Sequence, residues 1–111
     1  DGGYNQRRAQ CEEACRLIGI HQLRDIDVST LASKNLPDPL NRRARHVVTE
    51  NERVHQAVKA IKGNNLELLG KLFVESHKSM RDDYEVSIPE IDLLVELCIA
   101  DKDCFGARLT G

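Results

Sequence analysis

The stretch from Glu75 to Glu90 gathers residue types that often do chemistry in proteins. It contains His77, followed by Arg81 and the adjacent carboxylates Asp82 and Asp83. A histidine beside a carboxylate can act as a general acid or base. On a helix, however, His77 shares a face with Arg81 while the carboxylates lie elsewhere. We therefore predict a surface or helix-capping role for His77, a helix-end charge network for its three neighbours, and no catalytic residue in this chain.

The four cysteines predict structural thiols rather than a reactive or metal-binding site. They are Cys11, Cys15, Cys98 and Cys104. Neither pair has the two-residue separation of common zinc or redox motifs, and no histidine stands beside them. Free cysteine often packs as a small apolar residue. We expect no metal site here, with a metal site or a disulfide as the alternative.

Composition predicts a soluble globular domain, or part of one. The 111 residues include 16 basic and 18 acidic side chains, for a net charge of -2, and 41% are hydrophobic. This balance argues against a nucleic-acid-binding or anionic-membrane surface, and no apolar run could span a bilayer. With no secretory signal visible, we expect the reducing environment of the cytoplasm. The basic grouping of Arg42, Arg43, Arg45 and Arg53 is predicted to be a solvated helix face, with anion contact as the alternative.

Apolar spacing predicts a first helix that ends at Gly19, which can take a left-handed conformation. Its core face is expected to carry Cys11, Ala14, Cys15 and Ile18. On another face, three charged residues stand four apart and are expected to pair in solvent: Arg8, Glu12 and Arg16. A short second helix through Leu31 and Ala32 should be capped by Asp27.

The longest helix is predicted to start at Asp38-Pro39, with Asp38 as the cap and Pro39 at the first helical position, and to stop at Gly63. Its buried seam is expected to be Leu40, Ala44, Val47, Asn51, Val54, Val58 and Ile61. The next helix should be capped by Asn65 and fold back as a hairpin. Its predicted seam is Leu66, Leu69, Phe73, Ser76 and Met80. The polar Asn51 is expected to be buried and hydrogen-bonded, or else to face a site.

A capping box at residues 87–90 predicts a last helix. The chain then ends in a short strand-like run from Cys104 to Gly111. A lone strand cannot satisfy its own backbone groups, so we expect the sequence to be cut from something longer. The predicted fold class is mainly α: a helical hairpin with flanking helices and one short terminal strand.

Five separated motifs, in order along the chain, together resemble the C-terminal half of the galactokinases, which are sugar kinases of the GHMP superfamily. They are Tyr4–Arg8, Arg45–Val54, Glu75–Val86, Pro89–Glu96 and Gly106–Gly111. The resemblance implies the helical portion of an α+β, ferredoxin-like C-terminal domain. It also implies that residues 1–111 are a single partial domain, without the N-terminal catalytic domain and the final strands.

The resemblance implies a piece of an enzyme that transfers phosphate from ATP, with Mg2+, to the anomeric hydroxyl of galactose. Tyr4 matches the family's sugar-contacting tyrosine, which precedes the first helix of the lobe. Gly106, Thr110 and Gly111 match the start of the family's glycine-rich third motif. The expected partners are galactose, ATP and the missing N-terminal domain, and we expect no kinase activity from the fragment alone. A regulatory module of a galactokinase-like sensor and a kinase for N-acetylgalactosamine are the alternatives.

Overall fold

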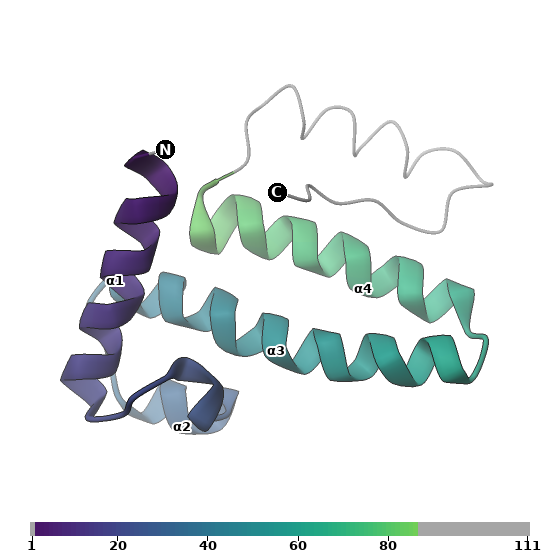
Figure 1. Cartoon of the computed structure of the whole chain (residues 1–111), viewed down its shortest axis with the longest axis horizontal. Helices are drawn as coiled ribbons and strands as arrows, with labels where there is room; N and C mark the ends of the chain where they lie inside the picture. Colours follow the sequence, from purple (N-terminus) through teal and green to yellow (C-terminus); the bar gives the residue numbers. More distant parts are fainter. Residues whose placement is uncertain (1, 87–111) are drawn as a thin grey trace. The chain divides into compact units, whose positions relative to one another are not determined.

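The described part of the chain is built from helices (Figure 1). The structure is a computed structural model that describes residues 2–86, except for the side chains at positions 2 and 4. In chain order the elements are α1 (Gly2–Ile18), the 3-10 turn η1 (Leu23–Asp25), α2 (Val28–Ser33), α3 (Leu40–Lys62), α4 (Leu66–Ser79) and the π-helical turn η2 (Met80–Tyr84). The mainly α prediction is confirmed over these residues. The predicted capping box, last helix and terminal strand lie outside them.

The chain divides into two compact units, Asp1–Asn51 and Glu52–Gly111, and α3 runs from the first into the second. As predicted, α3 is the longest helix of the described part. The first unit contains α1, η1, α2 and the start of α3. The second contains the rest of α3, α4 and η2.

Helix α1 ends where the sequence predicts. Gly19 has a φ of 87°, a left-handed conformation that glycine adopts without steric cost. Its N–H and that of Ile20 both donate to the carbonyl of Cys15, at 2.9 and 3.1 Å. These two bonds satisfy a carbonyl at the helix end that would otherwise lack a partner.

The charged face of α1 pairs differently from the prediction. Arg8 bonds Glu12, with 3.3 Å between Nε and Oε1, as expected. Arg16, however, pairs with Glu13 rather than with Glu12. Both pairs are exposed, so their contribution to stability is small.

Helix α2 begins at the predicted cap, and α3 does not. The Asp27 carboxylate accepts from the N–H of Thr30 at 2.8 Å. Asp38 instead accepts from the side chain of Arg42, with Oδ1 2.7 Å from Nε. Helix α3 starts at Leu40, which leaves Pro39 one residue before the first helical position. Arg42, one turn into α3, therefore binds the Asp38 carboxylate that was predicted to cap the helix.

The cap on α2 should loosen in acid. The Thr30 backbone N–H holds the pKa of the Asp27 carboxyl below its ordinary value. The stabilisation is therefore present above the unfolded pKa of about 3.9 and is lost as pH falls through the lower folded pKa. We expect the Thr30 amide to lose hydrogen-exchange protection in that window. Asp27→Asn, which keeps an accepting oxygen without the titrating proton, should remove this pH dependence; an unchanged dependence in the variant would contradict the assignment.

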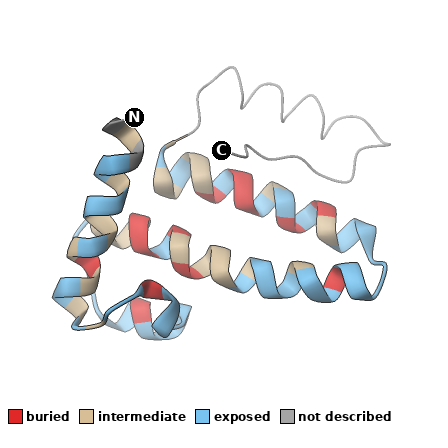
Figure 2. Ribbon diagram, viewed as in Figure 1, coloured by how far each residue is buried: buried red, intermediate tan, exposed pale blue. Residues whose placement is uncertain are grey.

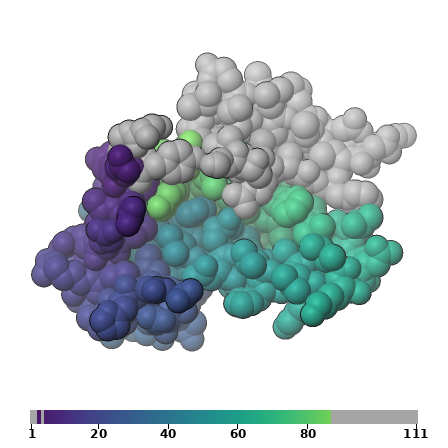
Figure 3. Space-filling view, in the orientation of Figure 1, coloured from purple at the N-terminus to yellow at the C-terminus, as the bar shows by residue number. Residues whose placement is uncertain are grey.

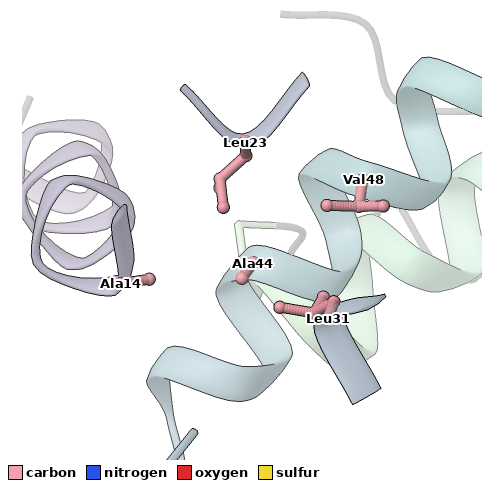
Figure 4. Close-up of a cluster of buried hydrophobic side chains, with 5 residues drawn as sticks. All are labelled: Ala14, Leu23, Leu31, Ala44 and Val48. Carbon is pink, nitrogen blue, oxygen red and sulfur yellow. The ribbon is translucent and has the colours of Figure 1, made fainter. Parts of the chain in front are cut away.

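The core of the first unit is a cluster of five buried apolar side chains that point toward one another (Figure 4). They are Ala14 from α1, Leu23 from η1, Leu31 from α2, and Ala44 and Val48 from α3. Ala14 and Ala44 have no exposed surface. Cys11, Cys15 and Ile18 pack against the cluster, so the predicted core face of α1 is confirmed.

The predicted seam fails in the second half of α3, which is mostly exposed (Figure 2). Val54, Val58 and Ile61 are exposed, and Ala60 is the buried residue there. A strict seven-residue repeat drifts by about 20° per heptad on a straight helix, so its later members rotate away from the face that its first members define. Asn51 is partly buried rather than fully buried.

Helix α4 also buries a different face from the one predicted. Leu66 and Phe73 are exposed, whereas Leu72 is 3% exposed. The buried residues are Gly70, Leu72, Ser76, His77 and Ser79. Leucine, phenylalanine and valine occur on several sides of this helix, so apolar spacing alone does not single out the covered side.

The turn between α3 and α4 forms the predicted hairpin, and its atoms, in teal, lie open at the surface (Figure 3). The left-handed residue is Asn64, with a φ of 53°, rather than Gly63. The N–H of Asn65 donates to the carbonyl of Ala60 at 2.8 Å, and that of Asn64 to Ile61 at 3.0 Å. Asparagine tolerates this conformation better than most residues, so the turn forms without a glycine there.

Replacing Asn65 by alanine should weaken the start of α4. The Asn65 Oδ1 atom accepts from the N–H of Leu68 at 3.1 Å, which confirms the predicted cap. Loss of such a cap costs about 1 kcal/mol. We expect a lower free energy of local opening at α4 amides, measured by hydrogen exchange on the full-length protein. Asn65→Asp keeps the acceptor and should retain protection; equal loss in both variants would show that the cap is not responsible.

Candidate functional site

A hydrogen-bonded cluster joins α1 to the start of α3 within the first unit. The Oε1 atom of Gln10 accepts from Nε of Arg43 at 2.9 Å and from Nη1 of Arg7 at 3.3 Å. Arg43 is 4% exposed. The solvated face predicted for the four arginines is therefore wrong for Arg43. The Arg43 side chain is turned toward α1, where it binds Gln10, rather than toward solvent.

A small pocket lies between α2 and α3, also within the first unit. Its volume is about 320 Å³, and it is lined by Val28, Leu31, Ala32, Asn35, Leu36, Asn41 and Arg45. Arg45 is exposed, as the sequence predicts. Its lining combines apolar side chains with two amides and a guanidinium, groups that can bind a small polar molecule.

His77 is the clearest correction to the sequence interpretation. It is 2% exposed, so the predicted surface role is wrong. The helical path does not stop beside it: η2 continues for five residues, and the N–H of Val86 reaches back to the carbonyl of Met80 at 3.2 Å. His77 therefore lies before the true end of the helical path.

The charge network predicted at the end of this stretch is confirmed. Arg81 places Nε 2.8 Å from Oδ1 of Asp82 and Nη2 3.1 Å from Oδ2. This two-point contact with Arg81 holds the pKa of the Asp82 carboxyl below its ordinary value. Ser79 donates to Asp83, with 3.4 Å between Oγ and Oδ2. The segment is organised as a helix end.

Cys11 and Cys15 are free thiols, partly buried beside the core of the first unit. Burial raises the pKa of the Cys15 thiol, and Asp25 and Glu12 add to the effect. A raised pKa lowers the thiolate fraction and hence reactivity, so the structural role predicted for these two is supported. Cys98 and Cys104 lie outside the described residues.

Between positions 2 and 86, no three His, Cys, Asp or Glu side chains come together as metal ligands would. Over the same residues, no helix is both long enough and apolar enough to cross a bilayer.

The residues that the resemblance implicates are only partly described. Tyr4 lies within the first turn of α1, not before the helix as expected, and its side chain is outside the described set. Gly106, Thr110 and Gly111 are also outside it. Sequence reasoning missed the link between Gln10 and Arg43, because no local spacing connects residues 33 positions apart.

Comparison with known proteins shows which family and which proteins the chain resembles. Residues 57–111 match the family described as GHMP kinases C terminal. Two curated galactokinases match 97–99% of the chain: that of Pasteurella multocida is 49% identical over 116 residues, and that of Chloroflexus aurantiacus 50% over 115. The chain spans about 30% of the length of each.

A solved structure agrees with these sequence matches. Lactococcus lactis galactokinase, crystallised in complex with galactose, superposes on 100% of the chain with a TM-score of 0.95 and 35% identity. The chain covers 30% of that protein. At this identity the match carries more than a shared fold. Residues 57–111 therefore match the C-terminal domain of GHMP kinases, and over its whole length the chain is similar to galactokinases.

Proposed function

We propose that this chain is the C-terminal lobe of a galactokinase, an enzyme that converts galactose and ATP into galactose 1-phosphate and ADP. The observation that carries the proposal is 49% identity to a galactokinase over 99% of the chain. In the intact domain, the helices described here would back a ferredoxin-like sheet.

Within this lobe, we assign sugar contact to Tyr4 and the floor of the site to the turn that starts at Gly106, Thr110 and Gly111. The phosphate loop and the groups that activate the sugar hydroxyl would come from the N-terminal domain. Phosphoryl transfer depends mainly on positioning and on neutralising phosphate charge, so a helical lobe can matter without supplying a nucleophile or base. No catalytic residue is assigned to this chain.

The family relationship implies the use of ATP. Mg2+ would accompany the nucleotide, and its binding oxygens would come from phosphates and carboxylates. We assign no residue between positions 2 and 86 to the metal, because no three candidate ligand side chains come together there. No step is therefore assigned to the metal through these residues. We place the intact enzyme in the cytoplasm, where ATP is available.

The test is a coupled ADP-release assay on the full-length gene product with galactose and Mg-ATP. We expect turnover that depends on galactose, and a product with phosphate on the anomeric oxygen. The 111-residue chain alone should give none, because the phosphate-binding groups are elsewhere. Absence of galactose-dependent turnover by the folded full-length protein would refute the proposed function. Turnover by the isolated chain would refute the assignment of the phosphate-binding groups to the N-terminal domain.

A further inference from the structure

We propose that Gln10 is a positioning residue for the sugar-binding side of the lobe. Its side-chain amide, held by Arg43 and Arg7, fixes the first two turns of α1 and through them Tyr4. This inference rests on the proposed function, because it takes Tyr4 as the sugar-contacting residue.

The first step is the contact itself. The Gln10 carbonyl oxygen has two lone pairs, so it can accept from Arg43 at 2.9 Å and from Arg7 at 3.3 Å together. The first of these bonds joins α1 to α3, and its donor is almost fully buried. Hydrogen bonds from an ionised donor are about twice as strong as neutral ones. A buried guanidinium also needs its acceptors, so the Gln10 oxygen is held firmly in place.

The second step is where this contact lies along α1. Among the residues that pack against the core cluster, Cys11 is the one nearest the start of the helix. Gln10 lies one residue before Cys11, and Arg7 lies one turn before it. The hydrogen bonds of Gln10 therefore extend the stabilisation of α1 toward its first turn. That turn includes Gly2 and Gly3, which are poor helix formers. A helix start of this kind depends on side-chain contacts to stay fixed.

The third step connects the Gln10 contact to sugar binding. Tyr4 is three residues before Arg7, so the two positions lie on neighbouring parts of the same helix face. A side chain that binds the substrate contributes fully only when it is held in the right geometry. Loosening the Gln10 contact would let the first turn of α1 shift, and the backbone of Tyr4 would shift with it.

The experiment uses the full-length enzyme and measures galactose binding by calorimetry together with steady-state kinetics. Gln10→Leu should raise the Kd and KM for galactose about tenfold, or about 1.4 kcal/mol, with kcat near wild type. Gln10→Glu should bind nearly as wild type, because a carboxylate accepts from both guanidinium groups. Gln6→Leu is the matched control: the same change one turn away at an exposed position, expected to leave Kd unchanged.

A double-mutant cycle separates positioning from general destabilisation. If Gln10 acts through Tyr4, adding Tyr4→Phe to Gln10→Leu should change the galactose Kd by less than twofold, although Tyr4→Phe alone has a larger effect. Fully additive effects would overturn the inference. Should Gln10→Leu fail to fold, Gln10→Asn keeps the amide but shortens its reach, and the same tenfold rise is expected from it.

The outcomes also distinguish this inference from the function on which it rests. A full-length protein that neither binds nor phosphorylates galactose refutes both. A protein that phosphorylates galactose, but whose Gln10→Leu and Gln10→Asn variants bind it with wild-type Kd, refutes this inference alone.

Discussion

Replacing Leu31 by alanine is expected to lower the stability of the first unit by about 2–4 kcal/mol. Leu31 is 3% exposed and packs with Leu23 and Val48 around the two alanines of the core cluster. The cluster has five members, two of them alanines, so the loss of a leucine side chain leaves a cavity that its small neighbours cannot fill. Hydrogen exchange at α2 and α3 amides of the full-length protein would measure the change.

Leu17→Ala is the matched control for this change. Leu17 is on α1 but 47% exposed. The same truncation there removes little buried surface, and we expect less than about 1 kcal/mol. A Leu31→Ala effect no larger than the Leu17→Ala effect would show that the cluster is not the core of the unit.

Local chemistry carried most of the correct fold predictions. Gly19 ends α1, and Asp27 and Asn65 cap α2 and α4, because each of these roles depends on a few neighbouring residues. Capping and left-handed turns are short-range effects, so the sequence alone determines them well.

The wrong predictions concern helix faces whose burial depends on contacts with distant parts of the chain. The exposure of Val54 and the burial of His77 depend on which face of a helix another part of the protein covers. Apolar spacing indicates that a helix has a face to bury, but it does not measure the rotation of that face. Asp38 shows the same limit at short range, since a cap and an ion pair with Arg42 compete for one carboxylate.

The candidate site was only partly predictable from the sequence. The residues tied to a family motif, such as Tyr4, could be named from the sequence by resemblance. The contact between Gln10 and Arg43 could not, because it depends on how α1 packs against α3. A glutamine on a helix is ordinarily a solvated residue. The arginine gave no signal of burial either, since it stands in a basic run next to Arg42 and Arg45.

Tyr4→Phe in the full-length enzyme is expected to raise the KM for galactose several-fold, up to about tenfold. The change removes one hydroxyl and leaves the ring, so it deletes a single hydrogen bond worth about 0.5–1.5 kcal/mol. A contact made equally to bound substrate and transition state alters KM and leaves kcat unchanged. Initial rates over a range of galactose concentrations, at saturating ATP, would measure both constants.

Tyr84→Phe is the matched control, because it removes a hydroxyl from the second of the two tyrosines in the chain. Tyr84 ends the π-helical turn η2 in the other compact unit, and no sugar contact is assigned to it. Its replacement should leave the KM for galactose at the wild-type value. If Tyr4→Phe also left KM and kcat unchanged, the assignment of Tyr4 to the sugar would be wrong. If both variants raised KM equally, the effect would not be specific to Tyr4.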